Sequence, residues 1–342
     1  MAVRTQTDDI DDLYITTAIK MRKSIEDQIF GSTKLLKYMM AKGRVKDISG
    51  GRWMEIPLRY ATMTSVVSAF GKTHDFTAGN TAAKSLQTLT DAKVEWRNMY
   101  IPIYRNWEED QENKGTEKIF SLMEEKLENA KLSMMEVLSD WIFGSNDHST
   151  DITFEGIGNW IKDVPNATYA NRYTQGNISQ GDYDNDGVSH NTWWNNQATA
   201  MTGYNVSVFL REKMTTAFNN CSKGMLTEYP DIIVMPQALH ENFETITTEQ
   251  KLIVNDTKGD PAFESIAFKG KPVIWDDDCP AAHIYMLNFQ YFYLGLDPDV
   301  KFSPTNWKEE TGSVDRFMQI LLRGNLICTN RSKQAVLYDV GV

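Results

Sequence analysis

The feature that most constrains this chain is a long amphipathic helix pattern between Thr116 and Phe143. Apolar side chains recur along it at spacings of three and four, namely Phe120, Met123, Leu127, Ala130, Met134, Leu138 and Trp141. At 1.5 Å per residue this helix would be roughly 40 Å long, and Gly144 follows where a helix commonly ends. Glu124 and Glu128 lie on its polar face, so we interpret them as solvated or subunit-facing side chains rather than catalytic ones.

Two alternating runs precede this helix. In residues 54–60 apolar side chains occupy every second position, which predicts a half-buried strand. A second run begins at Lys93, and its phase shifts near Asn98, which predicts a bulge or bend. Pro57 and Pro102 cannot donate to a strand ladder, so edge positions are expected for both strands.

The segment between the two runs, residues 71–91, is rich in Gly, Thr and Ala and has little to bury. Two edge-like strands with a long polar tip predict an extended hairpin. An isolated two-stranded hairpin is only marginally stable in water. We therefore expect it to need a partner surface, and a neighbouring copy of the same chain is the simplest one.

The regions before the hairpin and after the long helix differ in their sequence patterns. Residues 8–42 predict a helical arm, interrupted at Gly31, that is too short to form its own core. Residues 145–200 are polar and irregular, and an α/β pattern follows them. It predicts helices at 206–221 and 237–246 and strands at 231–235, 271–275, 283–288, 291–296, 317–322 and 334–338. The inward side chains expected on the first of these helices are Val208, Phe209, Met214, Phe218 and Cys221.

Composition excludes several classes of function. The chain has 342 residues, enough for about two compact units. Its 46 acidic and 35 basic residues give a net charge of −11, which argues against tight nucleic-acid binding. The three cysteines form no CxxC pair, so a cysteine-based zinc or redox site is not expected. There is no signal-peptide pattern at the N-terminus and no apolar run of the ~18 residues that a membrane span needs.

Two acidic clusters are the only metal candidates, and both have an ordinary alternative. Asp182, Asp184 and Asp186 match the first half of a D-x-D-x-D-G calcium loop, but position twelve is Trp193 instead of the bidentate Glu. An acidic turn is the default interpretation, and a weak surface calcium or magnesium site is the alternative. Asp276–Asp278 follow a strand, where adjacent side chains diverge, so a turn is again expected.

No catalytic signature accompanies these features. The sequence contains no H-E-x-x-H, G-x-S-x-G or G-x-x-x-x-G-K-[ST] motif, so neither a catalytic residue nor a cofactor is expected. The pair Trp193-Trp194 lies in a polar stretch. It could anchor a subunit contact or simply pack a loop.

The order of these elements resembles the major capsid proteins of tailed bacteriophages, which have the Hong Kong 97-type fold. Three local stretches are also similar to that family: residues 50–57 (GGRWMEIP), 268–276 (FKGKPVIWD) and 324–330 (GNLICTN). The resemblance implies an α+β fold divided as follows: N-terminal arm 1–49, E-loop hairpin and flanking strands 50–105, peripheral-domain spine helix 106–145, axial domain 146–297 and peripheral-domain β-strands 298–342.

The resemblance also implies a function. It predicts a non-enzymatic virion subunit, assembled in the host cytoplasm, that forms the hexamers and pentamers of an icosahedral head. The shell would enclose double-stranded DNA without sequence-specific binding and without a membrane. The implied partners are a scaffolding protein, a portal and a decoration protein. The assembly contacts expected on this basis are Arg52, Trp53, Glu55, Arg59, Lys84, Arg97, Trp193 and Trp194.

Two other functions remain open from the sequence. An encapsulin-like compartment shell shares the same fold, and a short cargo-binding groove would favour it. A metal-dependent enzyme would have to use the acidic clusters at 182–186 or 276–278, and loss of an activity in an Asp184→Ala variant would support it.

Overall fold

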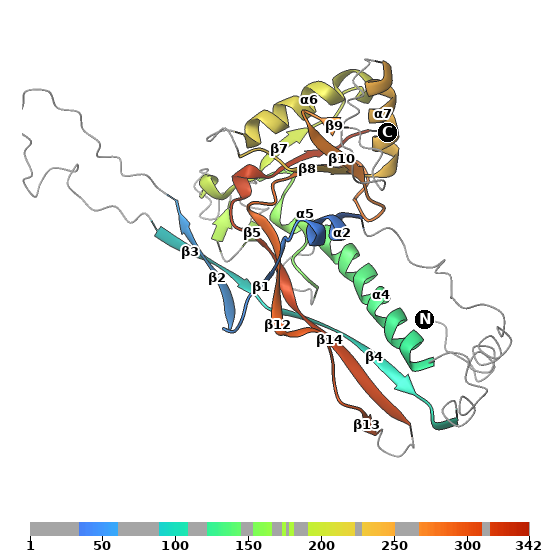
Figure 1. The fold of residues 1–342 in the computed structure, drawn as a ribbon. Helices are drawn as coiled ribbons and strands as arrows, with labels where there is room; N and C mark the ends of the chain where they lie inside the picture. The colour runs from blue at the N-terminus through green and yellow to red at the C-terminus, as the bar shows by residue number, and fades with distance from the viewer. Residues whose placement is uncertain are drawn as a thin grey trace, which may run out of the picture.

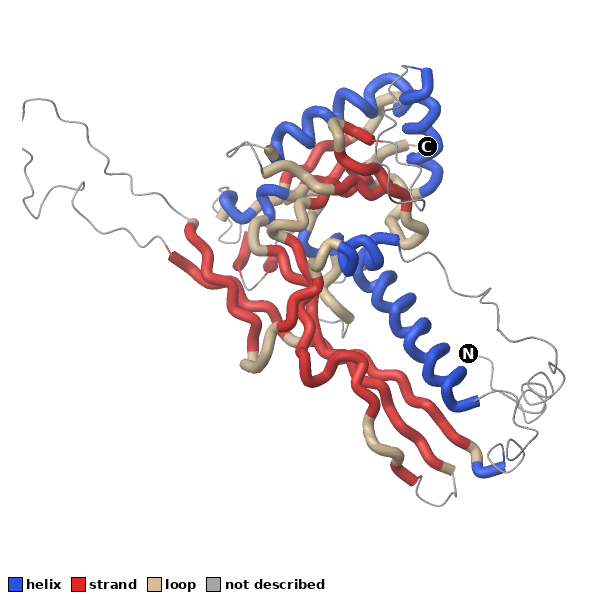
Figure 2. Tube along the Cα trace, viewed as in Figure 1, coloured by secondary structure: helices blue, strands red, loops and turns tan. Residues whose placement is uncertain are grey.

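The computed structural model describes residues 34–60, 89–108, 122–144, 153–165, 173–175, 178–180, 191–222, 228–249, 267–309 and 315–341. These residues form two sheet-based bodies joined by a shared core, with a two-stranded hairpin projecting from them (Figure 1). Helices lie mainly on the upper body and along one side of the lower one (Figure 2). The predicted hairpin tip, the helix predicted before Gly31 and the predicted start of the long helix at Thr116 fall outside the described residues.

The lower body is a five-stranded sheet. Its strands are β1 (Val45–Asp47), β12 (Phe292–Pro304), β14 (Arg316–Cys328), β13 (Lys308–Glu309) and β4 (Arg97–Arg105). β4 pairs antiparallel with β14 from Arg105↔Arg316 to Arg97↔Gly324. Side chains on one face, such as Met99 and Ile103, are buried.

The long helix α4 (Leu122–Phe143) lies along this buried face (Figure 1). Its predicted apolar positions Ala130, Met134 and Leu138 are buried, which confirms the periodicity. Gly144 follows the last helical residue as predicted, and its N–H donates to the carbonyl of Trp141 over 3.1 Å.

The upper body is a six-stranded sheet covered on one face by α6 (Val206–Cys221) and α7 (Gln237–Glu249). Its strands, in spatial order, are β7 (Gln197–Ala200), β15 (Ala335–Tyr338), β11 (Ile284–Leu287), β8 (Ile232–Met235), β10 (Lys271–Trp275) and β9 (Ala267–Phe268). β8 is buried at every position, because alternate side chains enter different cores. Ile233 packs with the helices, and Ile232 points into the core shared with the lower body.

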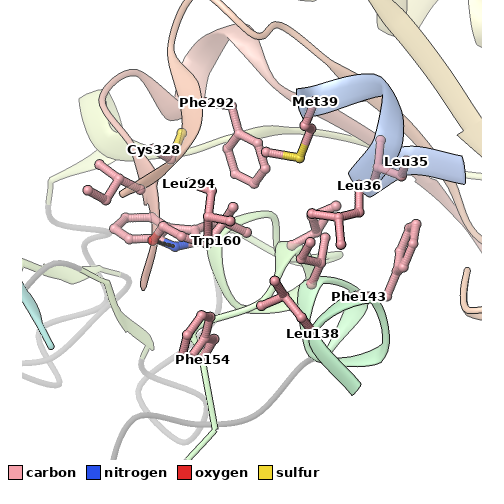
Figure 3. Packing of buried hydrophobic residues seen from close by; sticks show 14 of the residues in the cluster. Leu35, Leu36, Met39, Leu138, Phe143, Phe154, Trp160, Phe292, Leu294 and Cys328 are labelled. Atoms are coloured by element: carbon pink, nitrogen blue, oxygen red, sulfur yellow. Dashed lines mark hydrogen bonds between the residues drawn. The ribbon is translucent and has the colours of Figure 1, made fainter. Parts of the chain in front are cut away.

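That shared core joins the two bodies. The helix α2 (Lys34–Ala41) buries Leu35 and Met39 in it, beside Leu138 of α4, Trp160 of α5 (Ile157–Trp160) and Phe292 of β12 (Figure 3). These side chains come from distant parts of the sequence and are nearly or completely inaccessible to water. The arm segment is therefore anchored by its own apolar side chains, as its composition predicted.

The predicted hairpin is present at its base. β2 (Trp53–Arg59) and β3 (Leu89–Glu95) are antiparallel, in register from Trp53↔Glu95 to Arg59↔Leu89. The phase shift expected near Asn98 corresponds to the break at Trp96. There the chain leaves the hairpin as β3 and enters the five-stranded sheet as β4.

Two expectations were wrong. Val208 was placed inward on α6, but it is 67% exposed, and Leu210 and Ala217 are buried in its place. Val206, Leu210, Met214 and Phe218 recur at the helical spacing of four and face the core, whereas Val208 lies midway between the first two and therefore faces away from it. Residues 298–342 were expected to form peripheral-domain strands, yet β15 lies in the six-stranded sheet between β7 and β11.

Candidate assembly surface

The base of the hairpin presents a polar face of predicted contact residues. Met54, Ile56 and Leu58 of β2 are buried, so Glu55 and Arg59 point to the opposite side and are exposed. The carboxylate of Glu55 lies 3.9 Å from the ammonium of Lys93 on β3. An exposed pair of this kind contributes little stability. The exposed face therefore remains available to a partner.

The other predicted contact residues on this side pair mostly with their own neighbours. The guanidinium of Arg52 lies over the ring of Trp53, 5.0 Å from its centroid. Arg97 and Glu95, at the junction of β3 and β4, form an ion pair of 3.7 Å. Lys84 lies outside the described residues.

Aromatic side chains gather where the hairpin meets the upper body. Tyr60, at the end of β2, packs against Trp193 with ring centroids 5.6 Å apart. Trp193 packs in turn against Trp194, also at 5.6 Å. These rings, with Tyr291 and Tyr293, line an open groove of about 620 Å³ beside β2. Glu55 and Arg59 also line it, so the structure brings four of the predicted contact residues together.

Within the pair of tryptophans, the two residues have different roles. Trp193 is half-buried, whereas only 2% of Trp194 is exposed. The expectation that Trp194 is itself an assembly contact is therefore corrected: it packs a loop and supports Trp193. The short 3-10 helix Thr192–Trp194 carries both side chains.

The loop that carries these tryptophans is held by Arg331, which is completely buried. Its Nε donates to the carbonyl of Trp160 over 2.6 Å, and its two terminal nitrogens donate to the carbonyl of Trp194 (3.0 Å) and to Oδ1 of Asn196 (3.2 Å). Burial lowers the pKa of the guanidinium to about 9. The group still carries its charge at neutral pH, and the charge is satisfied by carbonyl oxygens rather than by a carboxylate.

The acidic run Asp276–Asp278 has a structural use. Asp276 is fully buried and accepts the N–H of Leu35 at the start of α2 over 2.9 Å, and Asp278 accepts the hydroxyl of Ser139 over 2.6 Å. Burial raises the pKa of both carboxyls. Their oxygens face N–H and O–H donors, which is the arrangement of a turn and not of a metal site. The expected turn is confirmed.

The other metal candidates, Asp182, Asp184 and Asp186, lie outside the described residues. Within the described part of the chain, no group of three His, Cys, Asp or Glu side chains is arranged to hold a metal ion. None of the described helices is both long and apolar enough to cross a membrane. The three cysteines are buried, and burial raises the pKa of Cys221 and Cys328 to about 12.

Comparisons with known proteins give a fold. No family model matches the sequence, and no curated protein matches it. Solved structures do match along nearly the whole chain. The encapsulin of the holo-SrpI complex from Synechococcus elongatus PCC 7942 aligns with a TM-score of 0.59 and 10% identity, covering 99% of this chain and 96% of that one. The capsid protein of cyanophage A-1(L) aligns with a TM-score of 0.59 and 16% identity, covering 94% and 96%. The capsid protein of the Myoviridae phage XM1 aligns with a TM-score of 0.53 and 7% identity, covering 98% and 99%.

The chain has the Hong Kong 97-type capsid fold. In the terms of this fold, β2 and β3 are the base of the E-loop and α4 is the spine helix. The five-stranded sheet belongs to the peripheral domain, and the six-stranded sheet with α6 and α7 is the axial domain. The predicted fold class, α+β, is confirmed.

Sequence reasoning missed the residues that hold this surface in place. Arg331, Asn196 and Tyr291 were not singled out, although Arg331 fixes the tryptophan loop and Tyr291 lines the groove. No motif marks them, because each acts through a contact with a distant segment. Arg331 stands in the polar stretch 329–334, two residues before Lys333, so nothing in the local sequence signals its burial.

Proposed function

We propose that this chain is the major capsid protein of a tailed bacteriophage. Hexamers and pentamers of it would build an icosahedral shell around double-stranded DNA, and the chain would have no catalytic role. The observation that carries this proposal is the whole-chain match to shell subunits, which includes both sheets, the spine helix and the E-loop base. Scaffolding, portal and decoration proteins would be its partners during and after assembly in the host cytoplasm.

The surface of the peripheral domain supports a role in assembly. Tyr100 and Tyr104 project from the outer face of β4, 65% and 57% exposed, and Trp107 follows them at 52%. In the register of the sheet, Tyr100 lies opposite Leu321 and Tyr104 lies opposite Phe317 of β14. Extended apolar faces of this kind are uncommon on monomeric proteins and are typical of interaction surfaces.

An assembly experiment tests this proposal. The full chain is expressed, with a scaffolding partner where one is required, and studied by sedimentation and negative-stain microscopy. We expect uniform shells or capsomer rings. A chain that remains monomeric under every condition would overturn the proposal.

Arg59 offers the sharpest test of the predicted contact residues. It is exposed on β2, and no described side chain forms an ion pair with it. We expect Arg59→Glu to reduce the yield of shells, because a reversed charge would face the neighbouring subunit. Lys131→Glu, at an exposed position of the spine helix, is the matched control with the same change in charge. Equal yields of shells from both variants would show that Arg59 is not an assembly contact.

The second candidate function is an encapsulin-like compartment shell. The observation that favours it is the open groove lined by Trp193, Tyr291 and Tyr293, which has the size and aromatic lining that suit a short peptide. The contents of assembled shells distinguish the two functions. Packaged nucleic acid supports the bacteriophage role, and a single co-purifying cargo protein, lost in a Trp193→Ala variant, supports the compartment role.

A further inference from the structure

Basic side chains are concentrated in one short part of this acidic chain. Residues 34–52 contain six of them and a single acidic residue, Asp47, although the net charge of the whole chain is −11. Five of these side chains form what we call the basic strip: Lys37, Lys42, Arg44, Lys46 and Arg52. Four of the five are exposed, and Arg44 is half-buried.

The fold keeps the basic strip at the surface of three successive elements. α2 turns its apolar side chains Leu35, Leu36 and Met39 inward, so Lys37 faces out. β1 pairs with β12 and with no other described strand, which leaves its second edge open. The chain then leads from β1 directly into β2, so the strip follows α2, β1 and the start of β2 along the body (Figure 1).

The charges of the basic strip are not neutralised within the described part of the chain. Instead of carboxylates, three of the side chains contact aromatic rings: Lys42 lies 5.4 Å from the ring centre of Tyr38, and Lys46 lies 3.9 Å from that of Tyr293. Arg52 lies over Trp53. A ring positions a cation but leaves its charge in place. The nearby carboxylate of Asp47 is already paired, with Lys301 at 3.2 Å.

Arg44 adds an independent observation. Its Nε atom is buried and donates to no acceptor in the described residues. Its backbone is fixed at both ends, because its N–H donates to Met39 over 2.9 Å and its carbonyl accepts from Leu294 over 3.0 Å. This buried atom is out of reach of an external anion, so Arg44 contributes to the basic strip through the positive charge of its guanidinium.

We propose that the basic strip binds the phosphodiester backbone of double-stranded DNA. Separate, unpaired cations along an extended edge suit repeating phosphates, and such contacts carry no sequence information. The inference rests on the proposed function and deepens it, since it places the α2–β1 edge on the inner side of the shell. It also confines DNA contact to this strip, because the rest of the chain is strongly acidic.

An acidic peptide is the rival partner, and this chain contains one. Asp8, Asp9, Asp11 and Asp12 have the complementary charge. They lie within a few residues of one another, however, whereas the basic strip extends over three successive elements. DNA fits the length of the strip better, and the acidic stretch becomes an outcome of the test.

The test measures salt-dependent binding to unassembled full-length chain. Fluorescence anisotropy follows a labelled duplex of mixed sequence and about 30 base pairs, between about 50 and 200 mM salt. The strip variant is K37Q/K42Q/K46Q. The control variant, K131Q/R211Q/K308Q, loses the same charge at exposed positions elsewhere.

We expect wild-type binding to weaken as salt rises. In the strip variant, the slope of log K against log salt should become shallower by about 0.9 for each lysine charge removed. The control should keep the wild-type slope. Equal losses in both variants, or no salt-dependent binding by the wild type, would overturn the inference. Binding that appears only in a D8N/D9N/D11N/D12N variant would also overturn it, because the chain's own acidic stretch would then occupy the strip.

Sedimentation of the same preparations separates this inference from the proposed function. Shells that form while the strip and control variants bind DNA equally would refute the inference and leave the shell function standing. DNA binding that depends on the strip, in a chain that never assembles, would refute the shell function and leave the DNA-binding surface standing.

Discussion

The buried carboxylate of Asp276 accepts a hydrogen bond from the backbone N–H of Leu35, 2.9 Å away and 241 positions earlier in the chain. Its other oxygen accepts the N–H of Asp278, whose own carboxylate accepts the hydroxyl of Ser139 on the spine helix. One turn after β10 thereby ties the arm helix and the spine helix to the axial sheet.

Asp276→Ala should destabilise the protein by about 1–3 kcal/mol, because it leaves the buried N–H of Leu35 without an acceptor. Asp276→Asn keeps one acceptor oxygen and should cost less. Chemical denaturation of the purified chain measures both. Asp277→Ala, at the exposed neighbouring position, is the control and should stay within about 0.5 kcal/mol of wild type. A loss of stability no larger for Asp276→Ala than for Asp277→Ala would contradict the role of Asp276 as the acceptor for Leu35.

Arg331→Lys should lower the free energy of unfolding by about 2 kcal/mol or more. A single ammonium group cannot satisfy the three acceptors that the planar guanidinium reaches, and charged hydrogen bonds contribute about 1.5–3 kcal/mol each. Arg211→Lys on the exposed face of α6 is the matched control. Trp fluorescence should report the same change, since Trp193 and Trp194 lie on the loop that Arg331 holds. If Arg331→Lys had the same denaturation midpoint as the wild type, the three hydrogen bonds of Arg331 would contribute little to stability.

His283 should titrate above its usual range. Its Nδ1 lies 2.8 Å from the carbonyl oxygen of Ala281 and its Nε2 lies 3.1 Å from the carboxylate of Asp163. Both neighbours only accept hydrogen bonds, so the doubly protonated ring satisfies both, and the bond to Asp163 raises the pKa of His283. The opposite shift is expected at His240, whose pKa is lowered by burial. An NMR titration distinguishes the two rings.

The contact between His283 and Asp163 also predicts how the stability of the protein depends on pH. Because the folded-state pKa of His283 lies above the unfolded value of 6.5, its stabilisation is fully present below 6.5 and is lost as pH rises through the folded-state pKa. The wild type should therefore exceed Asp163→Asn in stability by more at about pH 6 than at about pH 8.5. Asp339 also faces the ring and raises its pKa, so some shift should persist in the variant. A pH-independent difference would exclude the ionised pair.

Gly156→Ala should cost about 1–3 kcal/mol through overpacking. A Cβ at this position would lie 2.6 Å from the carbonyl oxygen of Trp141 and would also strike the backbone of Gly144. Both atoms belong to the end of the spine helix, which cannot move without disturbing the core. Gly341→Ala, which meets nothing within 4 Å, is the control. Thermal denaturation compares the two, and equal midpoints would show that the helix end can yield.

Local patterns predicted much of this fold. The helix 206–221 matches α6, and the strand 271–275 matches β10, because each is a short periodic segment with clear stop signals. The strands predicted at 291–296 and 317–322 are correct in kind but shorter than β12 and β14. β12 continues past its buried part, where exposed polar side chains hide the alternation, whereas β14 continues into the core, where residues 324–328 are all buried and show no alternation.

The candidate surface was predictable only in part. The strict alternation of β2 predicted that Glu55 and Arg59 lie opposite the buried face, and the family resemblance made them contact candidates. Trp194 did not follow, because its burial depends on Arg331, and the sheet membership of β15 depends on its pairing with β7. Such contacts join segments more than a hundred residues apart and leave no mark in either segment.

The pairing order of the strands has a consequence for synthesis on the ribosome. β4 acquires its partner only when β14 emerges, β1 waits for β12, and β7 waits for β15. The nascent chain therefore carries open strand edges until β15 (Ala335–Tyr338) has left the exit tunnel. The strands β12, β14 and β15 are thus translated after the strands β1, β4 and β7 that they pair with, and both bodies stay open until these three strands are available.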